Sequence, residues 1–494
     1  MKICLVSAFP PSHRGLSEYG FHIARELRRN PLIDLTILAD TLPQPVPELD
    51  GFNVKRCWNF YAFGNFWKLN RERRRCKPDQ VWLNLGFATF GDKPVQAFMG
   101  LAIPALVRLL GFHTHVTLHQ LMDSVDLHDA GISHPRLYRL AGLLITRILL
   151  LSHSISVLLP EYRSILKTRY GADRVYVRPH GVLAGEPEYP DFTLRGNPRH
   201  RILAFGKWGT YKRPEMLLDV FQMVVQEFPD AHLIIAGGDH PKTPGYIRSV
   251  ADRYSGDPHV EFTGYVPEDA VGDLYRSASI MVMPYTSSSG SSGVAHLACQ
   301  YGVPILAPDI HDFEQLVTTE GLAMEFFYHR DPRQMATKLV ALLKNPEKLE
   351  QMSLQNFAVG LHMTMPKIIR DYVRTFDVED RIHKMRSIAR YRRYPRWLPM
   401  RDRWARWRSD GRAVRDLWLP APHTLQPDGL KEAAAEKMRS VPHSDYCVGR
   451  AFLPASFLTC HPERSEGPVF LSLSQPCHLE QSEGPSFRLT QPHV

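Results

Sequence analysis

The chain has 494 residues, which is too long for one ordinary domain and predicts two or three. Hydrophobic residues make up 44% and charged residues 22%, and these values exclude a chain that is disordered or fibrous throughout. The net charge of +9 indicates an anionic partner such as a nucleotide, a phospholipid or a nucleic acid, without choosing among them.

The seven cysteines are scattered without any Cys-x-x-Cys pair, which argues against a zinc site or a disulfide framework and favours a reducing cytosol. Nothing at the start resembles a secretory signal, because Lys2 precedes a short apolar run that ends at Pro10. The apolar residues 140–159 are long enough for a bilayer span. Arg147 and the polar residues 152–154 divide them, however, and predict the end of a buried helix followed by a strand.

Short strand-like runs alternate with helical stretches from the first residue, which predicts parallel sheets covered by helices on both faces. The expected strands of a first domain are residues 3–9, 35–39, 81–85, 115–119, 155–159 and 175–178. After a Gly-Asn-Pro linker at 196–198 the pattern restarts, with expected strands at 202–205, 233–236, 260–263, 280–283 and 303–307. We therefore predict an α/β protein with two facing Rossmann-like, doubly wound domains, whose ligands bind in the loops beyond the carboxyl ends of the strands.

The loop after the first expected strand contains Gly15 and leads into a helix. Glycine allows the backbone to approach a ligand closely, and the free N–H groups of the following helix favour an anion. The glycines here do not form the dinucleotide-binding pattern, so an ordinary strand-to-helix turn is an open alternative.

Two loops of the second domain are candidates for an anion site. Lys207 and Lys212 lie five residues apart after a strand, next to Gly206, and can converge on a diphosphate whose charge grows as it leaves. Solvated surface lysines are the alternative. The second loop precedes an apolar helix with small residues that expose N–H groups and hydroxyls toward an anion, namely Ser289, Gly290, Ser291, Ser292 and Gly293. A flexible linker is the alternative there.

His119 ends the expected strand 115–119, which places its imidazole at the carboxyl edge of the first sheet. His180 has a comparable place near the domain junction, and a purely structural histidine is the alternative at both positions. Its position makes His119 the better candidate. No His-x-x-x-His, cysteine pair or acidic triplet indicates a metal, and no Gly-x-Ser-x-Gly indicates a serine hydrolase.

In this order, these segments resemble the retaining, metal-independent glycosyltransferases of family four, which have the GT-B architecture. The resemblance extends from residue 1 to about residue 376 and rests on Gly15, His119, Pro-His-Gly-Val at 179–182, the loop 206–212, Gly-Tyr-Val at 264–266 and Gly-Val-Pro-Ile at 302–305. It implies an acceptor domain at 1–195, a nucleotide-sugar donor domain at 196–365, and a closing helix at 366–380 that returns to the first domain.

The resemblance also implies residue roles. Lys207 and Lys212 would bind the donor diphosphate and act in catalysis, with His119 beside the transferred sugar and Gly15 and Gly206 close to the donor. The family usually has two glutamates eight residues apart in the donor loop, where this chain has Ser289 and Leu297. We expect the hydroxyls and N–H groups of residues 287–293 to substitute, and Glu314 is the nearest carboxylate for a hydroxyl contact.

The function implied by the resemblance is transfer of a hexose from a nucleoside diphosphate sugar, with retention, to a glycan or lipid-linked acceptor in the synthesis of a cell-surface polysaccharide or glycolipid. The nucleotide sugar is a co-substrate, and no cofactor or metal is expected. Two alternatives stay open. One is a non-catalytic sugar-nucleotide-binding subunit, which the missing glutamates favour. The other is a sugar-nucleotide epimerase on the same fold, which needs acid–base groups that the sequence does not place.

Residues 381–420 form a basic segment. Between residues 381 and 415 there are thirteen Lys or Arg and two acids, with three interleaved tryptophans, and residues 400–418 show the periodicity of a basic amphipathic helix in a lipid interface. A second basic cluster lies at residues 71–77. We expect a cytoplasmic protein with an anionic membrane surface as a further partner, peripheral at the inner face. A solvated tail and tryptophans packed back on the body are the alternatives, and nucleic acid is not expected because no recognised module is present.

Residues 421–494 are rich in Pro, Ser and Glu and have little apolar periodicity, which predicts disorder. Residues 460–468 return imperfectly as residues 477–485. Two copies of so short a unit cannot build a solenoid, and we expect this repeat-containing extension to have no function.

Overall fold

The computed structural model describes residues 1–12, 14–43, 49–91, 93–121, 135–192, 200–240, 243–288 and 290–392. All of them belong to one compact unit, Met1–Leu417. The expected linker at 196–198, the basic amphipathic helix at 400–418 and the extension 421–494 lie outside the described residues.

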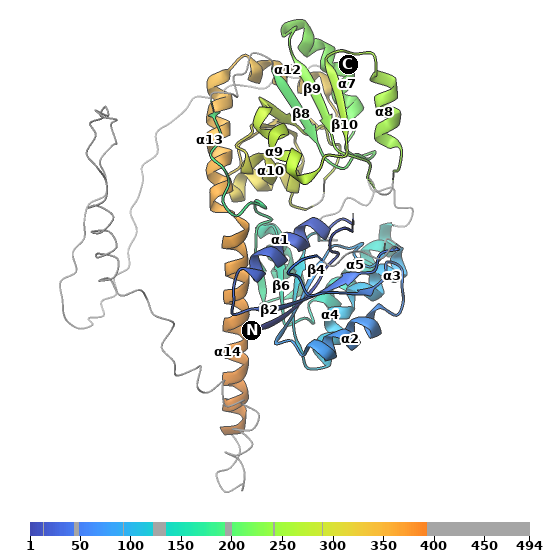
Figure 1. The fold of residues 1–494 in the computed structure, drawn as a ribbon, viewed down its shortest axis with the longest axis vertical. Helices are drawn as coiled ribbons and strands as arrows, with labels where there is room; N and C mark the ends of the chain where they lie inside the picture. Colours follow the sequence, from blue (N-terminus) through green and yellow to red (C-terminus); the bar gives the residue numbers. More distant parts are fainter. Residues whose placement is uncertain are drawn as a thin grey trace, which may run out of the picture. The chain divides into compact units, whose positions relative to one another are not determined.

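The first domain is built on a seven-stranded sheet in which every pairing is parallel (Figure 1). Its strands are β1 (Lys2–Val6), β2 (Asp34–Asp40), β3 (Val54–Trp58), β4 (Gln80–Leu85), β5 (His113–Leu118), β6 (Ser154–Val157) and β7 (Val175–Val177). The strand order is β3-β2-β1-β4-β5-β6-β7, and the central β4 is buried along its whole length. Helices on both faces explain why these strands are nearly continuous apolar runs.

Six helices connect these strands. They are α1 (Ser17–Arg28), α2 (Asn65–Cys76), α3 (Pro94–Leu101), α4 (Ile103–Leu109), α5 (Pro135–Leu149) and α6 (Pro160–Tyr170). Proline in the first turn of α3, α4 and α6 favours a helix start, because its missing N–H has no intrahelical partner there. The left-handed Gly171 ends α6 and leads directly toward β7.

The second domain repeats the plan with a six-stranded parallel sheet of order β10-β9-β8-β11-β12-β13. Its strands are β8 (Arg201–Phe205), β9 (His232–Ala236), β10 (Val260–Gly264), β11 (Ile280–Val282), β12 (Ile305–Pro308) and β13 (Met324–Phe327). Its helices are α7 (Pro214–Glu227), α8 (Tyr246–Tyr254), α9 (Glu268–Ser277), α10 (Gly293–Gln300), α11 (His311–Gln315), the π-helix η3 (Leu316–Glu320), α12 (Pro332–Leu343) and α13 (Pro346–His362). The strand order reverses between β1 and β4 in one sheet and between β8 and β11 in the other, and ligands bind at such switch points.

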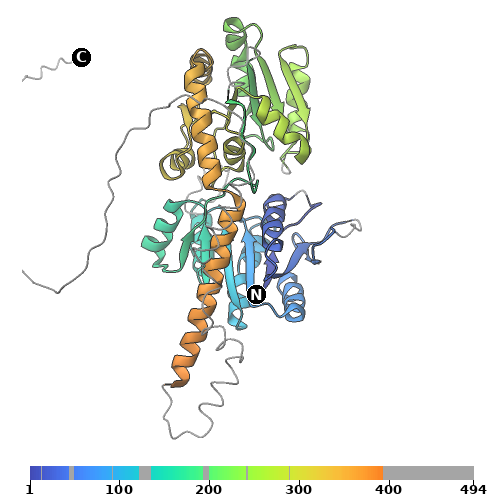
Figure 2. The same cartoon turned by 60° about the vertical axis from the view of Figure 1, so that its left-hand side comes forward.

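The last described helix, α14 (Met365–Arg392), returns to the first domain (Figures 1 and 2). It begins after a parallel bridge between Val182 and Thr364. The ring of Tyr372 lies 4.4 Å from that of Trp82, and its hydroxyl oxygen accepts a 3.0 Å hydrogen bond from Thr117 of β5. Glu379 accepts hydrogen bonds from Ser154 and Tyr176. The helix therefore forms part of the core of the first domain.

The predicted fold class is confirmed, and the predicted strands are found within a few residues of their expected bounds. The sequence analysis missed β3 and β13, and α14 is longer than the expected helix. Residues 140–159 divide into the end of α5 and the strand β6, as predicted. None of the described helices is long and apolar enough to cross a bilayer.

Candidate active site

The predicted loops begin at the carboxyl ends of the strands that flank the two switch points. Gly15 follows β1, and Lys207 and Lys212 follow β8. Residues 287–293, which we call the Ser/Gly loop, follow β11. His119 comes one residue after β5, at the same edge of the first sheet. Two parallel sheets therefore present the candidate residues where doubly wound folds bind ligands.

The ammonium group of Lys212 lies over the carboxyl end of β8. Its Nζ is 4.7 Å from the ring centroid of Tyr285 and 2.7 Å from the position that a Cβ on Gly206 would occupy, so a larger residue at 206 would collide with it. Burial, and then the nearby charge of Lys207, lower the pKa of Lys212 to about 8. Lys207 itself is exposed. A bound anion would stabilise the charged form of Lys212, which burial and Lys207 disfavour.

The Ser/Gly loop meets the first domain at Gly290. This glycine has φ +81°, and a Cβ there would lie 2.6 Å from the carbonyl oxygen of His119. Its N–H donates to Asp312 at 2.7 Å. The loop thus passes so close to the backbone of His119 that only glycine, which has no Cβ, fits at position 290.

The hydroxyls of this loop have unequal partners. Ser292 is the N-cap of α10, and its oxygen accepts from the Ala295 N–H at 3.3 Å. The buried hydroxyl of Ser291 has no hydrogen-bond partner within the part of the chain that the structure describes. Since buried polar groups are normally paired, Ser291 is a donor or acceptor available to a ligand beside the N-terminus of α10. Ser289 lies outside the described residues.

His119 is a buried, neutral imidazole. Its Nε2 lies 2.7 Å from Asn84 Oδ1, and the amide nitrogen of Asn84 donates to Ser7, so Nε2 carries the proton. Burial lowers the pKa of His119 to about 4. Nδ1 is therefore an acceptor, and among the described residues no group donates to it. The geometry fits an imidazole that accepts a hydrogen bond from a ligand hydroxyl.

His180 lies between residues of both domains. Its ring centroid is 4.7 Å from that of Tyr19 and 6.3 Å from that of His119 in the first domain, and 5.1 Å from that of His296 in α10. Burial, followed by the neighbouring His296 and His119, keeps the pKa of His180 well below its usual value. His180 is thus a neutral packing group at the junction.

His296 forms a buried ion pair that the sequence analysis missed. Its Nδ1 lies 2.7 Å from the Ser292 carbonyl and its Nε2 2.8 Å from Glu320 Oε2, so both nitrogens face acceptors and both carry protons. Burial opposes the charge, but the carboxylate of Glu320 and the Ser292 carbonyl raise the pKa of His296 overall. The pair connects the first turn of α10 to the end of η3. Glu320 is 24 residues from His296 in the chain, and no sequence spacing signals such a pair.

The two remaining candidates lie in different surroundings. Gly15 is exposed, and a Cβ there would meet no atom within 4 Å, so the protein itself does not require glycine and leaves open space beside the loop. The half-exposed Glu314 lies 3.9 Å from His311, and none of its contacts in the described residues reaches the Ser/Gly loop. The carboxylate that reaches this loop is Asp312, two residues earlier, which the sequence analysis did not name.

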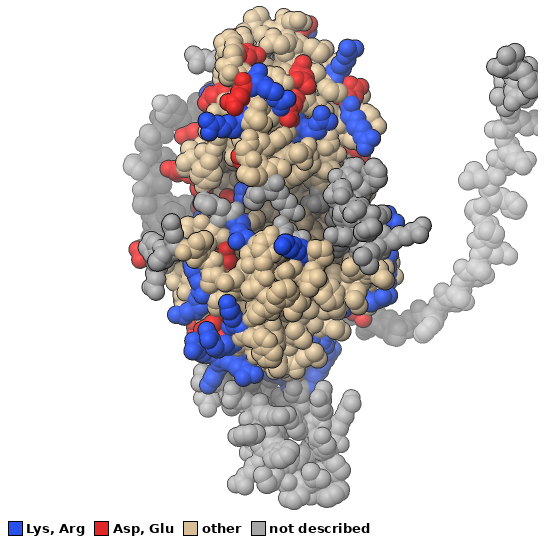
Figure 3. All heavy atoms as spheres, turned by 90° about the vertical axis from the view of Figure 1, so that its right-hand side faces the viewer, with Lys and Arg blue, Asp and Glu red and all other residues tan. Residues whose placement is uncertain are grey.

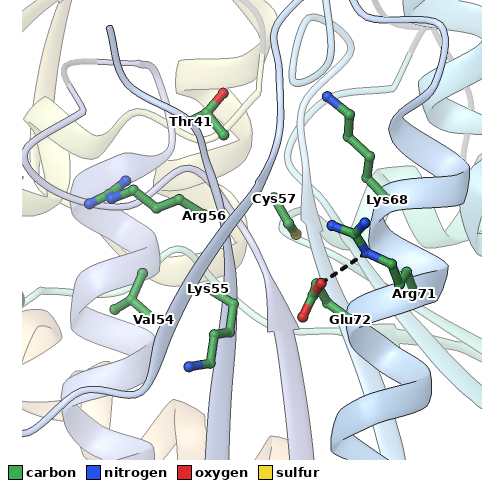
Figure 4. A pocket seen from close by; sticks show the side chains of 8 residues that line it. All are labelled: Thr41, Val54, Lys55, Arg56, Cys57, Lys68, Arg71 and Glu72. Carbon is green, nitrogen blue, oxygen red and sulfur yellow. Dashed lines mark hydrogen bonds and ion pairs between the residues drawn. The ribbon is translucent and has the colours of Figure 1, made fainter. Parts of the chain in front are cut away.

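A pocket of about 390 Å³ lies between β3 and α2 in the first domain (Figure 4). It is lined by Thr41, Val54, Lys55, Arg56, Cys57, Lys68, Arg71 and Glu72. Figure 4 shows Lys68, Arg71 and Glu72 rising from α2 and Lys55 and Cys57 from β3, with Arg71 paired to Glu72. The lining carries four cations and one carboxylate, and so favours an anionic group.

Comparison with known proteins relates this arrangement to glycosyltransferases. Residues 199–345, most of the second domain, match the family model described as "Glycosyl transferases group 1". The phosphatidyl-myo-inositol mannosyltransferase of Mycobacterium tuberculosis is 31% identical over 128 residues, which are 25% of this chain and 32% of that protein. The chain spans between 32% and 49% of the length of these curated relatives, which include a putative glycosyltransferase of Bacillus subtilis.

Solved structures extend the likeness to both domains. The sucrose-phosphate synthase of Thermosynechococcus elongatus superposes with a TM-score of 0.62 and 14% identity, covering 76% of this chain and 98% of that protein. Anabaena HepE in complex with UDP-glucose superposes with a TM-score of 0.57 and 14% identity, covering 76% of this chain and 100% of that protein. At such identities the likeness concerns the fold. The chain therefore has the GT-B fold of two Rossmann-like domains, and its second domain carries the sequence pattern of the group 1 glycosyl transferases.

Proposed function

We propose that the protein is a glycosyltransferase that moves a hexose from a nucleoside diphosphate sugar, with retention, to a glycan or lipid-linked acceptor. The observation that carries the proposal is the convergence of three features at the switch points of both sheets. These are Lys212 with its charged neighbour Lys207, the N-terminal turn of α10, and the Nδ1 of His119, whose carbonyl lies against Gly290. Among the described residues, neither this Nδ1 nor the Ser291 hydroxyl at the start of α10 has a hydrogen-bond partner. The lysines would bind a diphosphate, and His119 would bind the sugar attached to it.

The proposed donor is bound in a defined orientation. Lys207 and Lys212 contact the diphosphate, and the N–H groups at the start of α10 and the Ser291 hydroxyl contact the phosphate or the sugar. His119 accepts a hydrogen bond from a sugar hydroxyl through Nδ1. The likeness to HepE, whose structure holds UDP-glucose, supports a nucleotide sugar as the first ligand to examine.

The proposed reaction needs no nucleophile from the protein. The bond between the anomeric carbon and the diphosphate breaks, and the acceptor oxygen bonds to the same face of the sugar. The proton of the acceptor hydroxyl passes to the departing diphosphate oxygen. Lys207 and Lys212 stabilise the negative charge that grows on the diphosphate, and we propose that they do so without a metal ion or cofactor. By analogy with an oxyanion-hole donor, each contributes about 3 kcal/mol to the transition state.

The proposed acceptor belongs to the synthesis of a cell-surface polysaccharide or glycolipid, at the inner face of the membrane. The relative from M. tuberculosis is named for a phosphatidyl-inositol acceptor, and this supports a lipid-linked acceptor here. The cationic pocket between β3 and α2 suits the phosphate of such a molecule.

The test is a panel of UDP, GDP, ADP and dTDP sugars added to the full chain, with and without EDTA, followed by thermal shift and by release of nucleoside diphosphate. We expect one donor to stabilise the protein and to release its nucleoside diphosphate slowly, equally in both arms. Lys212→Met should slow release about 10²- to 10³-fold, while Lys344→Met, a change on the surface of the second domain, should not.

The same panel separates the alternatives. Stabilisation without release, even with candidate glycan acceptors present, supports a sugar-nucleotide-binding subunit. Conversion of the sugar without an acceptor supports an epimerase. No stabilisation by any nucleotide sugar contradicts the proposed function, and loss of release in EDTA contradicts metal independence alone.

A further inference from the structure

The first domain carries exposed apolar side chains on three consecutive helices. Leu109 of α4 is 78% exposed, Leu140 of α5 is 64% exposed, and Val95 of α3 is 60% exposed. Met99, Leu106 and Leu144 on the same helices are also exposed. Single exposed leucines are ordinary, but a contiguous set is not, and such a set marks a surface that contacts something apolar.

The three helices form one face. Residues of α3 contact both α4 and α5, and α4 contacts α5. In Figure 1 the labels α3, α4 and α5 lie together in the right-hand part of the first domain. Viewed from that side in Figure 3, the lower part of the molecule presents a broad area with few charged side chains, with Lys and Arg at its margins. We call this the α3–α5 face.

The charge around the α3–α5 face has one sign. The described residues 93–121 and 135–160 contain no Asp or Glu, while Lys93, Arg139 and Arg147 are exposed among them. Soluble surfaces usually mix both signs. In the described residues the face is apolar, bordered by cations and without carboxylates on α3, α4 and α5, which suits an anionic partner that also has an apolar interior.

Helix α2 adds cations at the border of this face. Its buried Arg73 lies 3.4 Å from the ring centroid of Phe112, so α2 lies beside the loop that follows α4. A second pocket, of about 410 Å³, lies on α2 and is lined by Trp67, Asn70, Arg71, Arg74 and Arg75. Trp67 is itself 71% exposed. An exposed tryptophan among arginines is typical of a segment at the level of lipid headgroups.

The cations of α2 are only partly neutralised. Glu72 pairs with both Arg71 and Arg75, and it is the single acid in the helix. Within the described part of the chain, neither Lys68 nor Arg74 has a carboxylate partner. Lys68 and Arg71 line the pocket between β3 and α2 shown in Figure 4. Two neighbouring pockets with cationic walls are suited to phosphate groups.

We propose that the α3–α5 face docks on the surface of an anionic lipid bilayer, with the cations of α2 on the phosphate headgroups. Leu109, Leu140 and Val95 enter the interface between headgroups and acyl chains, and the cations at the border gain from the negative surface potential. A second copy of the chain is a poorer partner, because self-association through this face would bring together two borders in which the described cations outnumber the carboxylates.

This inference deepens the membrane part of the proposed function and rests on it, because it explains how a lipid-linked acceptor reaches the first domain. It is nevertheless tested without catalysis. A chain that binds vesicles but turns over no nucleotide sugar would retain the docking surface and lose the proposed activity. A chain that turns over donor but ignores vesicles would do the reverse.

The experiment is co-sedimentation of the full chain with vesicles of phosphatidylcholine alone and of equimolar phosphatidylcholine and phosphatidylglycerol. The test variant is Leu109→Asp with Leu140→Asp, and the matched control is Leu32→Asp with Leu354→Asp, two exposed leucines outside the face. We expect the test variant to partition onto the anionic vesicles at least tenfold less than the control, which should bind like the original chain. Circular dichroism and donor turnover check that each variant is folded.

A second pair of variants tests the charge. Arg139→Gln with Arg147→Gln should weaken binding to anionic vesicles and leave any binding to neutral ones unchanged, whereas Arg248→Gln with Arg333→Gln on the second domain should have no effect. Equal binding of the Leu109/Leu140 variant and its control overturns the proposal, because another segment is then the anchor. The proposal is also overturned if the original chain is a dimer in light scattering that this variant makes monomeric, because the face then contacts a second copy.

Discussion

The two lysines of the loop after β8 have different surroundings, and the difference is measurable. Lys212 is packed against Tyr285 and its pKa is lowered to about 8, whereas Lys207 is exposed. If Lys212 must be protonated to bind the donor diphosphate, kcat/KM falls as pH rises through about 8, because kcat/KM reports the free enzyme. The Lys212→Arg variant stays charged in this pH range, so its kcat/KM should not fall above pH 8, although the value will be lower than that of the original chain.

The measurement is the pH profile of kcat/KM for nucleoside diphosphate release between pH 6 and 9.5, with Lys212→Met expected to be about 10²- to 10³-fold slower at pH 7. Lys344→Arg is the control and should keep the original profile. A fall above pH 8 that persists in Lys212→Arg would assign the titration to another group.

The buried pair of His296 and Glu320 makes a prediction about stability. The pKa of His296 is raised above its ordinary value of 6.5 in the folded chain. The pair therefore stabilises the fold fully below pH 6.5, and this contribution is lost as pH rises through the raised pKa. The neighbouring His180 does not share this behaviour, because its pKa is lowered and it stays neutral.

The test compares the melting temperature of the original chain with that of Glu320→Gln across pH 5.5 to 9. The difference should be largest at the acid end and shrink as pH rises. His232→Gln, which removes a half-buried histidine beside the exposed Glu261, is a control and should give a smaller, flatter difference. A difference that grows with pH would mean that the buried pair is not charged.

At this scale the sequence reveals the local parts of the site but not its long-range contacts. Lys212 and His119 were predicted because each follows a recognisable strand, and the structure places both at the expected edge. Asp312 and Glu320 were missed because they reach Gly290 and His296 across 22 and 24 residues of chain. Glu314 was chosen over Asp312 by chain position alone, although on the short helix α11 the residue that points to the loop is Asp312.

At the scale of elements, the Ser/Gly loop depends on a glycine at its narrowest point. Gly290→Ala forces a side chain into a left-handed conformation and drives its Cβ toward the His119 carbonyl. Gly245→Ala is a matched control. The φ of Gly245, +82°, is nearly the same as that of Gly290, but nothing lies within 4 Å of the position that a Cβ would occupy there. Both changes should cost about 1–2 kcal/mol in backbone strain.

Only Gly290→Ala should go further, by displacing the loop from His119 and raising the KM for the donor at least tenfold. Urea denaturation gives the two stabilities and donor titration gives the two KM values. If both variants lose stability equally and bind the donor equally, the approach of Gly290 to His119 has no role in the site.

The elements that the sequence analysis missed are short edge strands. In β3 two consecutive cations, Lys55 and Arg56, interrupt the apolar residues and conceal the strand pattern. β13 has only four residues and follows a π-helix, so no periodicity can develop. The central strands were found because both faces are buried, which makes them continuous apolar runs. α14 was predicted too short because its turns after residue 380 carry charged residues, and a contact of these turns with the first domain, such as that of His383 with His113, involves a distant part of the chain.

At the scale of the whole molecule, the closing helix α14 completes the first domain. That domain therefore contains residues from the start of the chain and residues that follow the second domain. The core that contains β1, β2 and α1 is completed by Met365, Ile368 and Phe376. The first domain therefore cannot be expected to fold from residues 1–195 alone, because those apolar positions would be unfilled. The restart of the strand pattern predicted two domains. It could not show that the last helix of the first domain, α14, follows the second domain in the chain.

The composition of residues 421–494 predicts that this repeat-containing extension is dispensable. In the described part of the chain, the buried residues of all three hydrophobic clusters lie between Ile3 and Phe376. A chain that ends at Pro420 should keep the melting temperature of the full chain within about 1 °C. It should also keep the donor turnover, because the candidate site lies within residues 15–320.

The chain that ends at Pro420 should also keep its binding to anionic vesicles, because the α3–α5 face and residues 381–420 are both retained. A chain that ends at Arg392 then separates these two, since vesicle binding that survives the second truncation belongs to the face, and binding that disappears with it belongs to the basic segment. Loss of folding or turnover on the first truncation would show instead that residues 421–494 have a role which their composition does not reveal.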